Sequence, residues 1–291
     1  MTALLEWLLD PLQFAFMRDA LAMGVVLGVL CAVTGSYLIV QQMSMIGGVI
    51  SHSIVPGLSI AFFLGIDVGI GAFVAGVLSA ICVALLEKRS RLKVDAAMSL
   101  TLTTFLAFGI LLISLLKTNQ VDLSSLLFGD ILGVTRGDLG RTIAIAALII
   151  TLVKLFYKEL LFYSFDPLGA QASGLPVQGL YMGLISAITL TIVATMQVVG
   201  VLLVMALLVG PAITAYLLVK ELHQMMWVGA VLGAIASISG MYASYYLDLP
   251  SGPAIVMAIF AGFLLALCFS PRRGWLSRRG DRSTLPADSG S

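Results

Sequence analysis

His52 is the residue whose type and position could do chemistry within an apolar stretch of this chain. It lies between Ser51 and Ser53, and Pro56 follows four residues later. Because proline has no N–H, the carbonyl of His52 would lose its helical partner, so one residue offers an imidazole and a free carbonyl. With the two hydroxyls, these groups could hold a cation. The alternative is a neutral histidine that hydrogen-bonds to a neighbouring helix.

A second broken helix is expected in the apolar run 199–212. By the same argument, Pro211 frees the carbonyl of Leu207. Two interrupted membrane helices are a sequence pointer to a substrate path. The structural alternative is that glycine and proline are common in membrane helices without any such role.

The chain lacks the groups that most membrane enzymes and pumps need. No carboxylate stands at the centre of an apolar segment, so no acidic proton relay is expected. The motifs GxSxG, HExxH and GxxxxGK[ST] are absent from the sequence, which disfavours a hydrolase and ATP binding by this chain. Methionines such as Met205 could be soft-metal ligands, although most methionines here should fill gaps in packing. We expect no catalytic residue and no permanently bound cofactor.

The elements that position these residues are membrane helices. Hydrophobic residues make up 60% of the 291 residues and charged residues 11%, against roughly 25% charged in a soluble domain. We expect an all-α integral membrane protein with about nine transmembrane helices. It would comprise an interfacial N-terminal segment (1–18), a transmembrane domain (19–270) and a disordered cytoplasmic tail (271–291). The nine segments with about 20 mainly apolar residues are 19–40, 46–65, 68–87, 97–117, 139–157, 178–198, 200–219, 227–247 and 252–270.

The distribution of Lys and Arg predicts the orientation, because cytoplasmic loops are enriched in them. The nine-helix arrangement puts twelve of the sixteen basic residues on one side, including those of the 88–95 loop and the tail. The C-terminus is therefore expected in the cytoplasm and the N-terminus outside. An eight-helix arrangement would move only the N-terminal end inside. The net charge of +1 gives no reason to expect a nucleic-acid partner.

Three segments outside these helices are expected to fold. Residues 4–17 should form an interfacial amphipathic helix, and residues 124–132 a short helix at the outer membrane face. In the inner 158–177 segment, Asp166 can cap a helix that begins at Pro167, and Gly174 suits its end. A helix of about two turns is therefore expected on the cytoplasmic side.

At these residues the chain resembles a known family, the membrane permease subunits of ABC importers for manganese and zinc. The resemblance extends from about Leu9 to Ser270. Each motif is weak by itself, and their order and spacing make the match specific. The motifs are Ile50–Ser53 with Pro56 and Gly57, Phe128–Leu132, Phe165–Pro167 with Ala170 and Gly174, Gly200–Val204 with Gly210–Ala212, and Asp248–Gly252.

The resemblance implies a permease of the bacterial plasma membrane that moves Mn²⁺ or Zn²⁺ inward. It also implies three partners: a second copy of the chain, a dimer of cytoplasmic ATPases, and an extracytoplasmic metal-binding protein. His52 becomes the candidate metal ligand. The candidate translocation path comprises Ser51, Ser53, Pro56, Gly48, Pro211 and Leu207. The candidate contact with the ATPase comprises Asp166, Pro167, Ala170 and Gly174.

Gly48 departs from the family's pattern. Many members have Asp four residues before the histidine, on the same helix face. Without this carboxylate, coordination would use carbonyls, hydroxyls, water or another helix, or would be weak, which suits a path that must release its ion. Oxygen donors beside one histidine favour Mn²⁺, with Zn²⁺ next. A permease for iron or a metal chelate remains the alternative, and a membrane-embedded enzyme is disfavoured.

Overall fold

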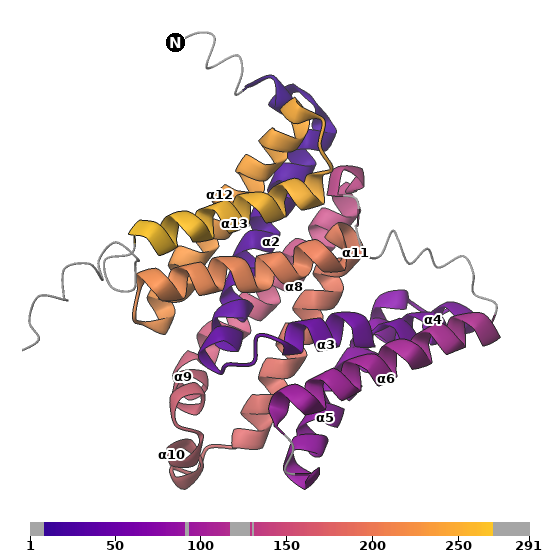
Figure 1. Ribbon diagram of the computed structural model, residues 1–291, viewed down its shortest axis with the longest axis vertical. Helices are drawn as coiled ribbons and strands as arrows, with labels where there is room; N and C mark the ends of the chain where they lie inside the picture. The colour runs from indigo at the N-terminus through magenta and orange to yellow at the C-terminus, as the bar shows by residue number, and fades with distance from the viewer. Residues whose placement is uncertain (1–8, 91–92, 117–128, 130, 270–291) are drawn as a thin grey trace, which may run out of the picture.

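The computed structural model describes residues 9–90, 93–116, 129 and 131–269 of the chain (Figure 1). Within that part every regular element is helical, which confirms the predicted class. Two short 3-10 turns, η1 (Pro11–Gln13) and η2 (Ile131–Gly133), accompany the longer helices. These are α2 (Ala15–Val40), α3 (Ile46–Ser53), α4 (Val55–Leu64), α5 (Val68–Ser90), α6 (Val94–Leu115), α8 (Arg136–Leu155), α9 (Tyr157–Phe165), α10 (Pro167–Ala172), α11 (Val177–Leu218), α12 (Leu222–Leu247) and α13 (Ser251–Phe269).

The described helices account for about nine membrane crossings. Seven segments are long and apolar enough to cross a bilayer, and α3 and α4 together form one of them. The bent pair of α8 and α9 raises the number to eight, and counting the two parts of α11 separately raises it to nine. The 42 residues of α11 would extend about 63 Å at 1.5 Å per residue, roughly twice the thickness of a bilayer core. Because the backbone of α11 leaves the helical region at Gly200, α11 consists of a first arm (177–199) and a second arm (201–218).

The bend in α11 depends on glycine. Gly200 has φ 75° and ψ 165°, a conformation that residues with a Cβ rarely adopt. Gly129 lies directly against this bend, because a Cβ there would overlap the peptide group that joins Val199 to Gly200. Figure 1 shows the two arms running in clearly different directions. Gly129 therefore packs where the path of the chain changes direction.

α11 is interrupted within the predicted run 199–212, but the break lies at Gly200 and not at Pro211. Gly200 leaves the helical region, whereas the dihedral angles remain helical through Pro211. One turn later the hydroxyl of Thr214 donates to the carbonyl of Gly210 at 2.7 Å. A proline removes one backbone donor, which a packed membrane helix can tolerate, whereas a positive φ changes the direction of the chain.

Two groups of helices meet at α11. In one group, α12 packs against both α2 and α13, and in the other α3, α4, α5 and α6 pack together. α11 contacts members of both groups, so it connects them (Figure 1). The α3–α6 group carries His52, and the second arm of α11 lies beside α3.

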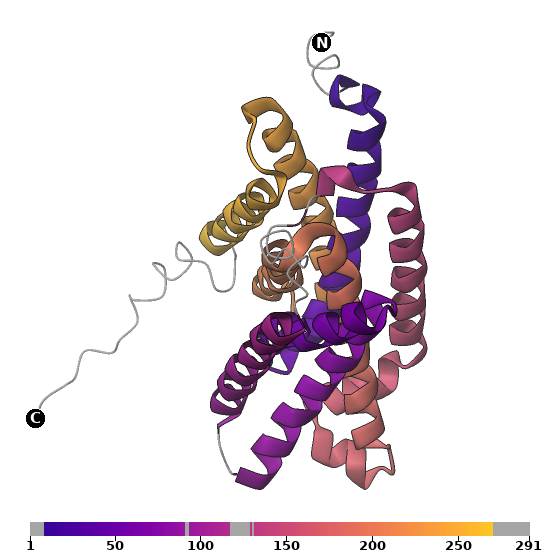
Figure 2. The same cartoon turned by 90° about the vertical axis from the view of Figure 1, so that its right-hand side faces the viewer.

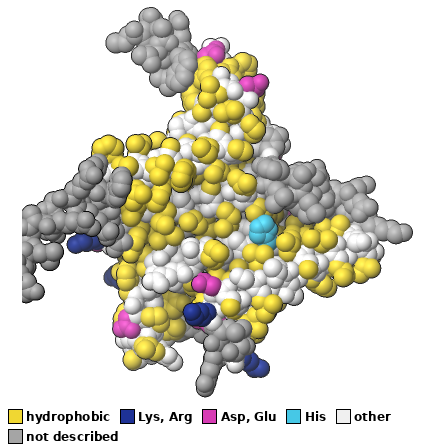
Figure 3. All heavy atoms as spheres, viewed as in Figure 1, with side chains coloured by type: hydrophobic (Ala, Val, Ile, Leu, Met, Phe, Trp, Pro, Cys, Tyr) yellow, Lys and Arg dark blue, Asp and Glu magenta, His cyan; other side chains and the backbone are white. Residues whose placement is uncertain are grey.

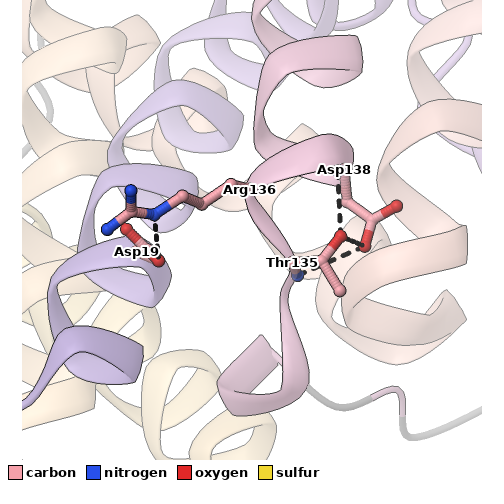
Figure 4. A network of polar contacts seen from close by, with 4 residues as sticks. All are labelled: Asp19, Thr135, Arg136 and Asp138. Carbon is pink, nitrogen blue, oxygen red and sulfur yellow. Dashed lines mark hydrogen bonds and ion pairs between the residues drawn. The ribbon is translucent and has the colours of Figure 1, made fainter.

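Polar contacts hold the start of α8 beside the first turns of α2 (Figure 4). The hydroxyl of Thr135 accepts from the backbone N–H of Asp138, whose carboxylate accepts from the N–H of Thr135, which forms a capping box. Arg136 extends to Asp19 of α2 at 3.6 Å. Such an exposed ion pair contributes at most about 1 kcal/mol, so its effect is to orient α8 more than to stabilise it.

Glycines allow the closest helix crossings, as expected where membrane helices associate by packing. We expect Gly71→Ala to lower the thermal stability of the purified protein, because its Cβ would overlap the carbonyl oxygen of Gly57 and force α4 and α5 apart. Overpacking of this kind costs about 1–3 kcal/mol. The matched control is Gly183→Ala, whose Cβ would meet open space. Equal melting temperatures for the two variants would contradict the crossing.

Three expectations lie wholly or partly outside the described residues. The tail 271–291 is outside them, as is most of the expected outer helix 124–132, of which Gly129 and the start of η2 are described. At the N-terminus, a single helix does not continue through residues 9–17. The turn at Asp10, the 3-10 turn η1 and extended Phe14 precede α2. α2 begins within the expected interfacial segment.

Candidate functional site

The helix that carries His52 is interrupted where Pro56 predicts. α3 ends at Ser53, Ile54 follows as a turn, and α4 begins at Val55 with proline in its first turn. The backbone of Ile54 remains near the right-handed helical region, and its carbonyl accepts from the N–H of Leu58 at 3.0 Å. The interruption is therefore a local change within one membrane crossing. It places His52 in the last turn of α3.

His52 is partly exposed on the outer surface of this single chain. The opposite side of α3 is buried, with Ile46, Val49 and Ile50 in the core. Gly48 is also partly exposed and lies one turn before His52, on the same helix face. Figure 3 shows a histidine over α3 with hydrophobic side chains around it. An imidazole in such surroundings can bind a ligand that reaches this face.

The two serines beside His52 differ in their availability. The hydroxyl of Ser51 donates to the carbonyl of Gly47 at 2.8 Å and lies 3.7 Å from the sulfur of Met205. The hydroxyl of Ser53 is buried and has no hydrogen-bond partner among the described residues. A buried polar atom without a partner is uncommon and calls for an explanation. Of the two predicted hydroxyl donors, Ser53 is thus the one that is not already engaged.

Met205 lies where a larger residue at position 48 would project. Its terminal methyl would be 3.4 Å from a Cβ at Gly48, and Leu208 would be 2.9 Å from a Cβ at Gly47. The second arm of α11 thus packs closely on α3 at its two glycines. The sequence singled out Gly48 as a missing ligand, but only the structure shows that a thioether lies beside it. The described residues contain no group of three or more His, Cys, Asp or Glu that could hold a metal.

We expect Gly48→Asp to strengthen metal binding. The new carboxylate would lie on the face of His52, and 3.4 Å leaves Met205 in ordinary contact with the added Cβ. One charge-assisted contact is worth about 1.5–3 kcal/mol, so the Kd for Mn²⁺ should fall by at least about tenfold. Titration calorimetry of the purified protein measures it. Gly48→Asn is the control of equal size, and an equal Kd for both variants would exclude a role for the charge.

Leu207 and Pro211 are not brought to the face of His52. Both are buried, and the carbonyl of Pro211 faces α12, where a Cβ at Gly229 would lie 3.5 Å from it. Their helix does reach α3, but through Met205 and the residues one turn away from it. In this single chain both residues are buried in the core, Pro211 beside α12, and their role in a path stays a prediction.

The short helix expected in the 158–177 segment forms as the sequence predicts. α10 begins at Pro167, and the carboxylate of Asp166 accepts from the N–H of Gly169 at 2.8 Å. Gly174 follows the helix with φ 83°, which is the left-handed conformation common after helix ends. α9 and α10 lie at the end of the molecule farthest from the described N-terminus (Figure 1).

A contact between small residues of α10 and a partner would require Ala170 to face outward, and it does not. Its side chain is fully buried, whereas Leu168 is 79% exposed and Phe165 is 63% exposed. The small size of Ala170 therefore serves the packing of α10 within the chain.

α9 was not predicted from the sequence, because the fifth membrane segment was expected to end at residue 157. Its axis bends by 70° from that of α8, and buried Leu160 and Tyr163, three residues apart, are the available signal.

The chain matches known proteins over most of its length. A model of the ABC 3 transport family matches residues 13–270. The manganese transport system membrane protein MntC of Listeria innocua is 40% identical over 91% of this chain and 94% of its own. A probable iron transport system membrane protein of Haemophilus influenzae is 38% identical over 92% and 98%. The solved structure of PsaBC from Streptococcus pneumoniae in complex with Fab matches with a TM-score of 0.84 and 36% identity, over 96% of this chain and 100% of that one.

Proposed function

The chain belongs to the ABC 3 transport family, and we propose that it is the permease of an importer that moves a divalent transition-metal ion into the cytoplasm. Manganese is the favoured ion and zinc the next. The observation that carries this proposal is the match along nearly the whole chain to a relative named for manganese transport.

Iron or a metal chelate is the alternative cargo. A relative of similar identity is named for iron transport, and Gly48 removes the anionic ligand that would favour a hard ion. The metal in either case is the cargo and not a resident cofactor. Uptake of Mn²⁺, Zn²⁺ and Fe²⁺, each supplied separately to a strain that lacks the gene, tests the proposal. We expect Mn²⁺ uptake to fall most, and unchanged uptake of all three would contradict a role in metal import.

A separate ATPase would drive the transport. The sequence contains no GxxxxGK[ST] motif with which to bind nucleotide. The contact would be α10, which is stiffened by Asp166 and Pro167 and presents Leu168 to its surroundings. Because α10 lies between α9 and α11 in the chain, a push on it would be transmitted to both.

Two further partners complete the proposed importer. His52 lies at the surface of a single chain, so a second copy that covers this face would enclose the ion between two permeases. An extracytoplasmic metal-binding protein would deliver the ion at the opposite end from α10. The lipid bilayer surrounds the apolar exterior, where exposed residues such as Phe108, Leu111 and Phe260 gather on α6 and α13.

The Lys and Arg distribution leads us to propose that the C-terminus and α10 are cytoplasmic in a bacterial plasma membrane. In a variant with Cys31, Cys82 and Cys268 replaced, a cysteine at Gly137 should react with an impermeant maleimide in intact cells. A cysteine at Ser173 should react only after lysis. Gly137 and Ser173 are both exposed in the structure. Labelling of Ser173→Cys in intact cells would reverse the orientation.

A further inference from the structure

A groove lies between α5 and α8, away from the face of His52. The first arm of α11 contacts both α5 and α8, whereas α5 and α8 hardly touch each other. The arm therefore forms the floor and the two helices form the walls of a cavity of about 850 Å³. This is within the range of about 300–1,000 Å³ found for ligand sites. Figure 2 shows α8 on the opposite side of the molecule from α6 and α13.

The lining of the groove is polar at one end of each helix and apolar further along it. On α8, Arg141 is followed one turn later by Ile145, and on the first arm of α11, Val193 and Leu190 lie one and two turns before Gln197. Where α5 begins, Asp67 is followed by Ile70 and Phe73. Seven residues of helix, such as Asp138 to Ile145, cover about 10 Å. The groove thus suits a molecule with a polar head and an apolar chain.

The charged residues of the lining have both signs. Arg141 is exposed and lies one turn after Asp138 on α8, where its charge acts on the Asp138 carboxylate, and no hydrogen bond or ion pair joins its guanidinium to another described residue. Asp67 accepts from the N–H groups of Gly69 and Ile70 through one oxygen, Oδ1. In Asp138, Oδ2 accepts from the backbone N–H and the hydroxyl of Thr135. Each carboxylate therefore retains an oxygen and a charge that can attract a cation.

We propose that this groove binds a phospholipid whose headgroup carries a primary ammonium, of the phosphatidylethanolamine class. Arg141 binds the phosphate, Asp67 and Asp138 bind the ammonium, and an acyl chain lies along Ile145, Phe73 and Leu190. The charge pattern selects this headgroup. A glycerol headgroup offers no cation to the two carboxylates, and a choline headgroup offers a cation without N–H donors.

Native mass spectrometry of the full-length protein, purified in mild detergent with an equimolar mixture of phosphatidylethanolamine, phosphatidylcholine and phosphatidylglycerol, tests the proposal. We expect about fivefold more bound phosphatidylethanolamine than either other lipid, as one or two charge-assisted contacts at a partly exposed site allow. Arg141→Gln should lower retention of that lipid about fivefold. Asp67→Asn keeps a cap for α5 and should abolish the preference over phosphatidylcholine.

Two matched controls separate the groove from general effects on α8. Arg136→Gln removes a charge from the same helix end but outside the groove, and should retain lipid as the unmodified protein does. Ala144→Trp would place an indole in the groove and should lower retention of all three lipids. Ala147 is also an exposed residue of α8 but does not line the groove, so Ala147→Trp should leave lipid retention unchanged. Equal binding of the three lipids to the unmodified protein, or equal losses in Arg141→Gln and Arg136→Gln, would overturn the proposal.

Discussion

Replacing His52 with alanine is expected to abolish metal uptake while the protein still inserts and assembles. The imidazole lies on a face whose other groups are a glycine, a thioether and largely apolar side chains, so nothing nearby can substitute for its nitrogen. Removing a residue that only hydrogen-bonds to a metal ligand lowers metal affinity or activity about 10- to 100-fold. Removing the ligand itself should therefore lower the uptake rate at least about 100-fold.

The other histidine supplies the matched control. His223 is exposed near the start of α12 and lies 3.3 Å from Glu221, so His223→Ala should leave uptake unchanged. Radioactive Mn²⁺ uptake is measured together with the amount of permease in the membrane and the amount of ATPase that copurifies. If His52→Ala transports normally at equal abundance, His52 is a packing residue and the metal path lies elsewhere.

Replacing Leu168 with aspartate is expected to uncouple ATP hydrolysis from transport. Leu168 is the most exposed large hydrophobic residue of the short helix α10, and a charge there would oppose burial in an apolar groove of a partner. Uptake should fall at least about tenfold, as loss of one buried apolar contact of about 1.5–3 kcal/mol allows. The readouts are metal uptake, ATPase rate and retention of the ATPase on the membrane.

This substitution is more informative than a change at Ala170. Ala170 is fully buried, so a bulky charge there would disturb the packing of α10 even if no partner bound it. Leu249→Asp is the control for retention of the ATPase, because Leu249 is an exposed residue in the connection between α12 and α13, at the other end of the bundle (Figure 1). If Leu168→Asp retains both ATPase binding and full uptake, α10 is not the coupling element.

The length of the apolar segments and the local effects of capping residues, glycine and proline made most of the fold predictable. Each expected membrane segment has a helix or an arm of α11, because about 20 apolar residues leave a bilayer few alternatives to a helix. The cap at Asp166 and the end at Gly174 were predicted because their backbone requirements are local. The interruption beside His52 was predicted for the same reason, since Pro56 acts within one helical turn.

The errors arose where tertiary packing decides the outcome. Pro211 has the same local chemistry as Pro56, yet α11 continues through it and bends at Gly200, where Gly129 packs against the backbone. α9 has few sequence signals of its own. Its axis bends by 70° from that of α8, and this bend accompanies the burial of Leu160 and Tyr163 against other helices. The exposure of a residue such as Ala170 cannot be predicted from its small size, since the same size suits contact with a partner and packing within the chain.

The candidate site was only partly predictable. The sequence identified His52 because a polar residue in an apolar segment stands out, and Gly48 because it departs from a pattern. It could not place Met205 against Gly48, since these residues come from helices far apart in the chain and meet through packing. Nor could it distinguish Ser51, which is engaged with Gly47, from Ser53.

Metal uptake into proteoliposomes that contain this chain, its ATPase and its delivery protein tests the central claim most directly. With Mn²⁺ outside and ATP inside, the account predicts accumulation that requires ATP, is absent with the His52→Ala variant and persists with the His223→Ala variant. Accumulation of Fe²⁺ or Zn²⁺ in preference to Mn²⁺ would contradict the choice of ion. Failure of the assembled complex to accumulate any of the three metals, despite active ATP hydrolysis, would contradict its assignment as a metal permease.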